Sequence, residues 1–532
     1  MEKNKQISVL IEKSHYGFFG ESGFVDNSNG PEIDRITQKD IGGDTYFLRV
    51  RNNTKDSIKI YSFVIADFVI PKNRTIGKVM EHGWLQCSEV ALRSSSEKTE
   101  QNKFFLQRDQ NPLSFKTEYG YISESIISEW FTFFEIEGLV CFIGAVTTAD
   151  QFAQVFIKQT ENGLRVRVTS QYDGLMLKPG EVIKSEKIFF GIDIESVVKK
   201  HFAESLARHM NVKNVAAPIK AMCNSYYWNG NKIDQDLINN ELDAIKALPK
   251  KLNLDYFQID AGYTEYFGDW LDYKHRFPLG FEPIVERIKE MGYKPAIWIS
   301  PFAINPATKL HDHHGSWLLK GDHKKHFEGR WTSPIDTFSD AFDLEVLDPT
   351  KDEVKEYLTQ VLTHFKNLGF LLFKIDFMYP LCLSEKYSKP VTRAQALREG
   401  ISHIRKVLGE QCQILSCITQ ISPLVGLVDF VRTGIDTLNP FVCGIPGVST
   451  MVNEYMLEKN ISESEARLFL NGIVWRADPD MLIFRGDTGI KQETIKNHKD
   501  MARANNLSLW VGDSVYNMDS KTKEELVEFF NK

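Results

Sequence analysis

The chain has 532 residues, which is too long for one ordinary hydrophobic core and predicts two or three domains. Hydrophobic residues make up 42% and charged residues 25% of the chain, a balance that excludes extended disorder. The net charge of −7, with no run of Lys and Arg, excludes the electrostatic footprint of a protein that binds nucleic acid or an anionic membrane. A neutral ligand fits this composition better.

The N-terminal residues and the cysteines bear on the compartment. The opening sequence MEKNKQISVLIEKS contains no apolar run of the length that a signal peptide or a membrane span needs. The seven cysteines are dispersed and form no CxxC pair, which argues against a disulfide framework and a structural zinc site. We therefore expect a cytoplasmic protein without membrane association, whose cysteines are mostly buried.

Residues 1–210 are predicted to form an antiparallel β-sandwich. Short runs rich in β-branched and aromatic residues, such as TYFLRV, WFTFFEI and VCFIGAV, alternate with polar stretches that favour turns. The apolar spacing predicts a helix at 194–210, and the sequence NVKNVAAPIK after it is typical of a linker. The first domain is therefore expected to end near residue 210.

Residues 211–532 are predicted to form a (β/α)8 TIM barrel. Nearly continuous apolar runs alternate here with amphipathic segments, as in parallel strands joined by crossover helices. The eight candidate strands are AMCNSYYW, YFQID, KPAIWIS, FLLFKID, QILSCI, FVRTGID, GIVWRADPDMLIF and LSLWVGDS. A doubly wound open sheet is the alternative, although no GxGxxG motif follows an early strand.

Two of the candidate strands end in a carboxylate with a cation beside it. Lys374 and Asp376 are two residues apart and point to the same face of an extended strand, and Arg432 precedes Asp436 at the end of another. Barrel active sites lie at these strand ends, and glycoside hydrolysis needs two carboxyl groups that flank the scissile bond. The simpler alternatives are a structural ion pair for the first couple and a turn or helix-cap role for Asp436.

Other strand ends carry groups that suit a neutral sugar. Asp260 and Trp298 end two strands, and Asp478 and Asp480 lie in WRADPDML. Carboxylates accept hydrogen bonds from sugar hydroxyls, and aromatic rings stack on the apolar side of a sugar ring. The pattern therefore indicates a sugar-binding rim.

The sequence contains no convincing metal or cofactor motif. The histidines of HDHHGSW fall in what we predict to be a polar loop, and their spacing matches no ligand pattern such as H-E-x-x-H. A P-loop and a G-x-S-x-G elbow are also missing from the sequence. We therefore expect no metal and no cofactor.

The order of the motifs resembles the melibiase-type α-galactosidases, a family that also holds raffinose and stachyose synthases. EHGWLQCS is similar to the family's Gly-aromatic-Gln-Ser-Trp-Ser element, QIDAGY to its Asp-Asp-Gly-Trp, and FGDWLDYKHRFPLGF to its Gly-Asp-Trp and Phe-Pro-x-Gly elements. HHGSWLLK is similar to its His-Pro-x-Trp loop, FKIDF to the nucleophile strand, LSC to the fifth strand and VRTGID to the acid/base strand. The motif ADPDML recurs across the clan.

The resemblance implies a retaining α-glycoside hydrolase with Asp376 as nucleophile and Asp436 as acid/base. It also implies that Lys374 and Arg432 contact substrate hydroxyls and these carboxylates, with Lys374 keeping Asp376 ionised. The expected substrate is a small neutral α-linked oligosaccharide or glycoside. The candidate substrate-binding residues are Asp260, Trp298, Lys374, Cys417, Arg432, Asp480 and Trp228.

The chain departs from the family pattern at several positions. Ala261 and Tyr263 stand where the family has Asp and Trp, ITQISPLVG replaces a Gly-rich segment, and the third strand ends in Ser300 without a Glu-like residue. A sugar hydroxyl that loses a buried partner costs roughly 1–3 kcal/mol, so the preferred sugar stays open.

Three further matters stay open at this point. The family's C-terminal β-domain has no counterpart in the sequence, which leaves open whether the chain forms a homo-oligomer. The alternatives to hydrolysis are a raffinose-synthase-like transglycosylase, which would pass the sugar to an acceptor other than water, and a catalytically decayed carbohydrate-binding protein.

Overall fold

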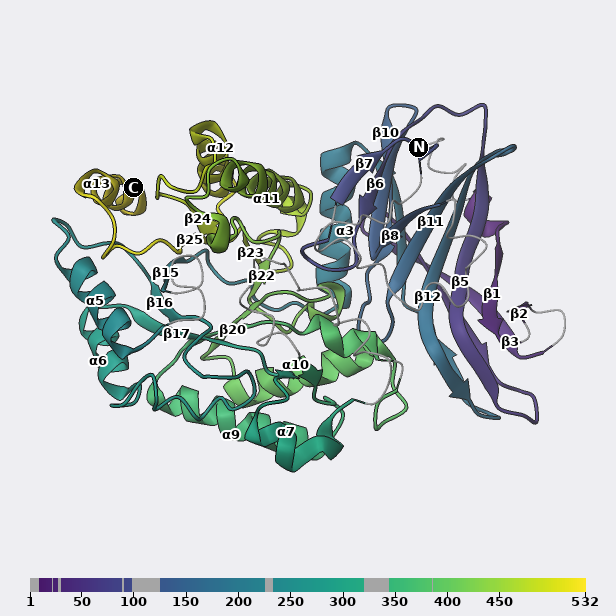
Figure 1. Cartoon of the computed structure of the whole chain (residues 1–532). Coiled ribbons are helices and arrows are strands. Elements are labelled where there is room, and N and C mark those ends of the chain that lie inside the picture. The colour runs from purple at the N-terminus through teal and green to yellow at the C-terminus, as the bar shows by residue number, and fades with distance from the viewer. Residues whose placement is uncertain are drawn as a thin grey trace. The chain divides into compact units, whose positions relative to one another are not determined.

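The computed structural model describes residues 9–21, 23–26, 30–88, 90–97, 125–224, 233–319, 344–384 and 386–532 (Figure 1). The chain divides into two compact units. The first comprises Met1–Asn214, Glu385–Arg398 and Gln420–Gly426, and the second comprises Val215–Ser384, Glu399–Thr419 and Leu427–Lys532. Across the described ranges, no helix combines the length and the apolar character that a bilayer crossing requires.

The first unit contains two antiparallel sheets. The six-stranded sheet has the order β2 (Gly23–Val25), β1 (His15–Gly20), β5 (Ile58–Pro71), β12 (Gly163–Leu177), β11 (Ala153–Thr160) and β8 (Ile126–Glu129). The eight-stranded sheet has the order β13 (Val182–Lys184), β4 (Gly43–Arg51), β14 (Ile188–Asp193), β10 (Leu139–Ala145), β9 (Phe131–Ile136), β6 (Ile76–His82) and β7 (Val90–Arg93), with β3 (Glu32–Asp40) paired to β4. The runs TYFLRV, WFTFFEI and VCFIGAV lie in β4, β9 and β10, as the sequence predicts.

Helix α3 (Glu195–His209) closes this unit and coincides with the helix predicted at 194–210. Its Phe202 ring is completely buried and stacks on Phe142 of β10 with the ring centroids 4.5 Å apart. A Cβ at Gly144 would lie 2.7 Å from the Phe202 ring. The helix can therefore approach the sheet this closely only because position 144 has no side chain.

The second unit is built on a parallel sheet. Its strand order is β23 (Arg476–Asp478), β22 (Phe430–Arg432), β21 (Gln413–Ser416), β20 (Leu372–Ile375), β17 (Lys294–Ile299), β16 (Tyr256–Ile259), β15 (Lys220–Asn224), β25 (Leu509–Val511) and β24 (Met481–Leu482). Every one of the eight predicted runs overlaps a strand, and the seventh overlaps two. The predicted change from antiparallel to parallel pairing along the chain is therefore confirmed.

The helices of the second part of the chain follow the strands. They are α5 (Gln235–Lys246), α6 (Glu282–Glu290), α7 (Lys309–His314), α9 (Asp352–Leu368), α10 (Arg393–Leu408), α11 (Val448–Glu465), α12 (Gln492–Ala504) and α13 (Ser520–Asn531). Helix α9 shows why they form: Val354, Leu358, Val361 and Phe365 recur at helical spacing and are buried, and Gly369 ends the helix with a left-handed φ of 108°.

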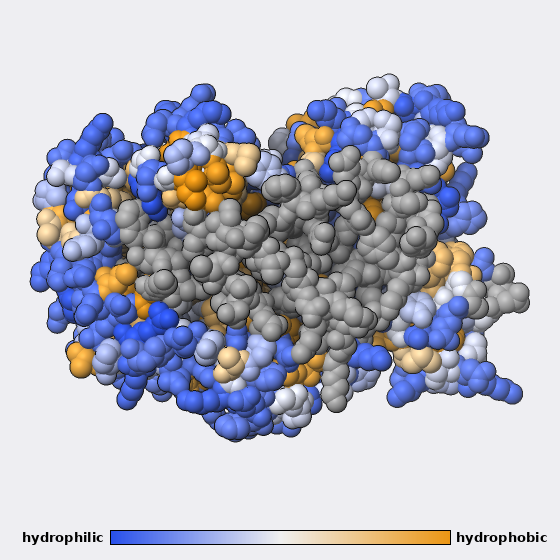
Figure 2. Space-filling model, viewed as in Figure 1, coloured by the Kyte–Doolittle hydropathy of each residue, from blue (hydrophilic) through white to orange (hydrophobic). Residues whose placement is uncertain are grey.

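Short elements complete the fold. They are the strands β18 (Ala303–Ile304) and β19 (Glu345–Val346) and the 3-10 helices η1 (Gly315–Trp317), η2 (Tyr379–Leu383), η3 (Ser422–Leu424), η4 (Pro440–Val442) and η5 (Leu468–Leu470). The face in Figure 2 is mostly hydrophilic where the structure describes it, in keeping with the charged composition.

The prediction that HDHHGSW forms a polar loop is wrong, because these residues form α7 and η1. The Thr308 hydroxyl caps the helix by accepting a hydrogen bond from the N–H of His311 at 3.1 Å. The rings of His314 and Trp317 stack with their centroids 3.8 Å apart. Among the described residues, no group of three or more His, Cys, Asp and Glu side chains is arranged to hold a metal ion.

An apolar layer of the parallel sheet lies one pleat before the strand ends. Side chains of alternate residues share a face, so the residue two positions after each member of this layer continues the same face. The layer consists of Ala221, Tyr256, Ala296, Leu372, Leu415 and Phe430. Two residues further on are Cys223, Gln258, Trp298, Lys374, Cys417 and Arg432. On β16, β20 and β22, an apolar residue is thus followed two positions later by the polar side chain of Gln258, Lys374 or Arg432.

We expect the change Phe202→Ala to lower the free energy of unfolding of the first unit by about 3–5 kcal/mol, because it removes a buried ring from a packed aromatic cluster. Urea unfolding followed by tryptophan fluorescence measures this loss. The matched control is Lys200→Ala on the exposed side of the same helix, for which a change within about 0.5 kcal/mol is expected. Equal losses in the two variants would contradict the packing argument.

Candidate active site

Asp376 follows the last residue of β20 and is buried. Its Oδ2 accepts a hydrogen bond from the Trp298 indole Nε1 at 2.9 Å, and its Oδ1 accepts one from the N–H of Phe377 at 2.8 Å. Phe377 has a left-handed φ of 51°, which turns the chain sharply away after the carboxylate. Donors on both oxygens fix the orientation of the Asp376 carboxylate.

Lys374 lies on the same strand and is held by Asp260 of the β16 strand end. Its Nζ donates to Asp260 Oδ2 at 3.1 Å, and both side chains are buried. Burial is the largest single influence and would lower the pKa of Lys374, but Asp260 and smaller contributions from Cys417 and Cys223 together hold that pKa well above its ordinary value. The sequence predicts Lys374 as the ionic partner of Asp376, whereas the ion pair that the structure contains joins Lys374 to Asp260.

Asp260 receives further donors besides Lys374. The Cys223 thiol donates to its Oδ2 at 3.1 Å, and the N–H of Ala261 donates to its Oδ1 at 2.9 Å. Burial would raise the pKa of Asp260, but the charge of Lys374 and these hydrogen bonds lower it. Sequence reasoning overlooked Cys223, whose signal is its place two residues after Ala221 of the apolar layer.

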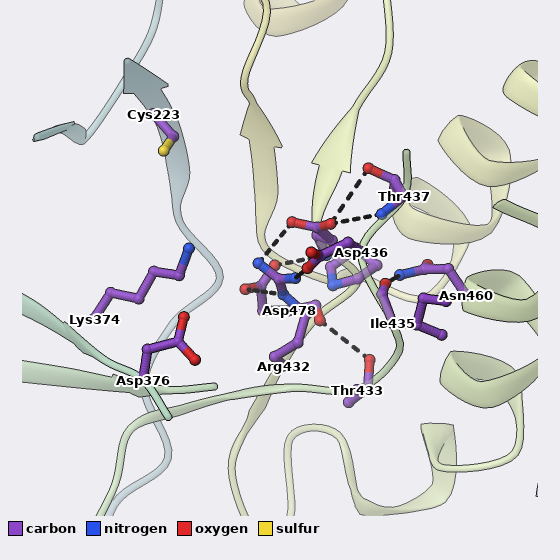
Figure 3. A network of polar contacts seen from close by, with 12 residues as sticks. Cys223, Lys374, Asp376, Arg432, Thr433, Ile435, Asp436, Thr437, Asn460 and Asp478 are labelled. Carbon is purple, nitrogen blue, oxygen red and sulfur yellow. Dashed lines mark hydrogen bonds and ion pairs between the residues drawn. The ribbon is translucent and has the colours of Figure 1, made fainter. Parts of the chain in front are cut away.

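Arg432 contacts three carboxylates from the end of β22 (Figure 3). Its nitrogens lie 3.2 Å from Asp436 Oδ1, 3.2 Å from Asp478 Oδ2 and 2.6 Å from Asp480 Oδ1. The side chains of Arg432, Asp478 and Asp480 are buried, whereas that of Asp436 is 36% exposed. One cation therefore faces three anions, and only Asp436 is open to water.

The surroundings of Asp436 favour its protonated form. Although the side chain is 36% exposed, the surrounding protein displaces part of the water around the carboxyl group, and this is the largest cause. The negative charge of Asp480 adds to it, and together they raise the pKa of Asp436 to about 6. Arg432 and Lys374 act in the opposite direction, and the charge of Asp376 raises this pKa further. Asp376 and Asp436 therefore lie within electrostatic reach of one another.

Cys417 lies among these charges at the end of β21. Burial raises the pKa of its thiol well above the ordinary value, with a contribution from Asp376, so the group is a neutral thiol near neutral pH. The charges of Arg432, Lys374 and Asp436 also act on it. The structure thus brings Asp376, Asp436, Lys374, Arg432 and Cys417 together.

Asp480 supports the loop that follows Asp436. Its Oδ2 accepts a hydrogen bond from the N–H of Thr437 at 2.8 Å, and its own N–H donates to Asp478 Oδ1 at 2.8 Å. A left-handed φ of 72° at Asp480 makes this bend. The structure does not contain the capping alternative for Asp436: the N–H of Asn439, three residues on, donates to Asn453 Oδ1 at 2.8 Å, and Asp436 contacts Arg432.

The candidate binding residue Trp228 and the family departure at Tyr263 are not among the contacts given above. Trp228 lies outside the described residues. Tyr263 is completely buried, and its hydroxyl donates to the backbone O of Trp298 at 3.0 Å. Tyr263, which stands where the family has Trp, therefore supports the backbone of Trp298.

Residues 196–374 match the family model described as Melibiase. The match ends at Lys374, before Asp376 and Asp436. The α-galactosidase Mel36A of Lactobacillus acidophilus is 25% identical over 182 residues, which cover 33% of this chain and 22% of that relative. The α-galactosidase C of Emericella nidulans is 29% identical over 158 residues, 26% of this chain and 19% of the relative. The chain thus matches about a fifth of the length of these curated relatives.

Solved structures share the fold over a longer range. TtGalA, an α-galactosidase from Thermus thermophilus, superposes with a TM-score of 0.66 at 18% identity, covering 94% of this chain and 95% of that one. The α-galactosidase AgaA from Geobacillus stearothermophilus gives a TM-score of 0.62 at 12% identity, covering 98% of this chain and 72% of that one. The family match and the curated relatives confirm the predicted resemblance to the melibiase-type α-galactosidases, and the solved structures show that the fold is shared.

Proposed function

We propose that the chain is a retaining α-glycoside hydrolase of the α-galactosidase kind. The observation that carries the proposal is the arrangement of two carboxylates at the ends of β20 and β22. Asp376 is buried and fixed by two hydrogen bonds, whereas Asp436 is half-buried, and its pKa is raised to about 6. Two carboxyl groups whose surroundings differ in this way suit a nucleophile and an acid/base.

The fold proposed for this function is a β-sandwich at 1–210 followed by a (β/α)8 barrel at 211–532. The two antiparallel sheets of the first unit support the sandwich. The parallel strand order begins with β23 and ends with β24, and only Pro479 and Asp480 separate these strands in the chain. A single run of chain therefore joins both ends of the strand order, which supports closure into a barrel.

The reaction proceeds in two displacements. In the first, an Asp376 oxygen attacks the anomeric carbon, the bond to the leaving oxygen breaks, and Asp436 gives its proton to that oxygen. In the second, Asp436 takes a proton from water, the water oxygen attacks the same carbon, and the bond to Asp376 breaks. Each step inverts the anomeric carbon, so the product retains the α configuration. Asp436 loses its proton in the first displacement and regains one from the attacking water in the second, so the cycle restores its protonated form.

Sugar binding is assigned to the groups around these carboxylates. Asp260 accepts hydrogen bonds, Lys374 and Arg432 donate them, and Cys417 contributes a neutral surface between the charges. Trp298 is committed to Asp376 through its Nε1, so its contribution to binding comes from the ring. TtGalA was solved with p-nitrophenyl α-D-galactopyranoside and with stachyose, and α-galactosides are therefore the first substrates to test.

We expect Asp376→Ala to reduce p-nitrophenol release from p-nitrophenyl α-galactoside by at least about 1,000-fold, because no group remains to form the covalent intermediate. The matched control is Asp500→Ala, an exposed carboxylate on α12, which should keep wild-type activity. NMR of the first-formed sugar should show the α anomer. Full activity of the Asp376 variant would refute the assignment, and transfer of the sugar to an added acceptor in preference to water would identify a transglycosylase.

The acid role of Asp436 predicts a pH dependence of kcat/KM. The proton must be present for the first displacement, so activity should be retained below the raised pKa and should decline as pH rises through about 6. In Asp436→Asn the decline of kcat/KM above pH 6 should disappear. The loss of kcat/KM should be about 100-fold larger on an unactivated disaccharide than on the nitrophenyl glycoside, since nitrophenolate leaves without a proton. An unchanged decline in the variant would assign the titration to another group.

A further inference from the structure

Helix α11 presents a buried polar face that the proposed reaction does not use directly. Asn460, Glu463 and Ser464 lie on this helix and Arg467 follows its end, at the spacing i, i+3, i+4 and i+7 that places them on one side. Their exposed fractions are 0%, 1%, 1% and 0%. Four buried polar side chains on one helix face are costly unless each has a partner.

The partners of all four lie in residues 433–435, directly before Asp436. The Ser464 and Thr433 hydroxyls share a hydrogen bond at 2.9 Å, and Arg467 Nη1 donates to the backbone O of Thr433 at 2.5 Å. The N–H of Ile435 donates to Glu463 Oε2 at 2.9 Å. Asn460 Nδ2 donates to the backbone O of Ile435 at 2.5 Å (Figure 3). The helix therefore holds this short segment by its backbone.

Gly434 allows the segment to lie directly on the helix. A Cβ at this position would come within 2.9 Å of Asn460 Nδ2, 2.9 Å of the Asn460 backbone O and 3.1 Å of its Cα. Gly434 is not among the residues with positive φ, so its backbone conformation is open to any residue. Glycine is therefore needed here for the close approach to Asn460.

The orientation of the Asn460 amide follows from its contact with Ile435. Reversing the amide would set its oxygen against the backbone O of Ile435, so the bond to Ile435 fixes the orientation. The amide thus orders the segment before Asp436 through the hydrogen bond of its Nδ2 to Ile435.

We propose that Asn460, with Glu463, Ser464 and Arg467, forms a positioning set that holds the Asp436 carboxylate in place for proton transfer. This inference rests on the proposed function. The backbone on one side of Asp436 is held by α11 through Ile435, and on the other side the N–H of Thr437 is held by Asp480. With both flanking residues fixed, the carboxylate keeps its contact with Arg432, and its proton stays within reach of the leaving oxygen.

The test compares two substrates that differ in their need for a proton, p-nitrophenyl α-galactoside and an unactivated α-galactosyl disaccharide. In Asn460→Leu, which keeps the number and branching of the side-chain heavy atoms and removes the hydrogen bond, kcat on the disaccharide should fall at least about 10-fold more than kcat on the nitrophenyl glycoside. KM should stay within about two-fold, because the sugar contacts are untouched.

Gly434→Ala disturbs the same contact from the opposite side and should give the same selective loss. If Asn460→Leu yields no folded protein, the Gly434→Ala variant tests the positioning role by itself. In the separate variant Glu463→Gln, the amide oxygen still accepts a hydrogen bond from the N–H of Ile435. The ratio of kcat on the disaccharide to kcat on the nitrophenyl glycoside should therefore stay within about three-fold of the wild-type ratio.

The matched control is Asn453→Leu on the same helix. Asn453 is also completely buried, but it accepts from the N–H of Asn439 and donates to the backbone O of Thr488, away from residues 433–435. It should change both substrates by the same factor. Equal losses on both substrates in the Asn460 and Gly434 variants would overturn the positioning role while the hydrolase stands. A wild-type protein inactive on both substrates would overturn the proposed function, and the positioning role with it.

Discussion

The site depends on one buried guanidinium that compensates three carboxylates. Arg432 contacts Asp436, Asp478 and Asp480, and two of these anions have no exposure to water. Buried charges of one sign are tolerated only with a partner of the other, and removing such a partner typically costs about 3–5 kcal/mol. The excess of negative charge left around Arg432 helps to keep a proton on Asp436. A single arrangement therefore serves both stability and the chemistry that we propose.

The period of the β-strand explains how much of this could be predicted from the sequence. Leu372, Lys374 and Asp376 share one face of β20, so a buried strand that ends in charge already indicates a site. The same local pattern locates Arg432 after Phe430, whereas Cys417 was expected only from the family resemblance. The predictions of Asp376 and Arg432 needed only neighbouring residues and the rule that parallel strands end at the same edge. The positions of the strands could also be predicted, because each is a short apolar run that is recognisable from neighbouring residues alone.

Contacts between distant segments were beyond local patterns. Lys374 pairs with Asp260, which is 114 residues away, and no spacing could have chosen Asp260 over the nearer Asp376. The indole of Trp298 donates to Asp376 because β17 and β20 are neighbours in register, with Trp298 opposite Lys374. The partners of the buried polar residues on α11 also could not be predicted, because they lie in residues 433–435, which are distant from the helix residues in the sequence. In each case, packing decided which of several available partners a polar group found.

Three strand ends turn through residues with left-handed backbones, and each turn lies beside a residue of the site. Phe377 follows Asp376, Ile418 follows Cys417, and Asp480 follows Asp478 by two residues. Such conformations cost about 1–3 kcal/mol each at residues other than glycine and persist only where the surroundings enforce them. The surroundings here are hydrogen bonds: the N–H groups of Met378 and Tyr379 both donate to the backbone O of Ile418. The turns after β20 and β21 thus stabilise each other, and they fix the backbone next to Asp376 and Cys417.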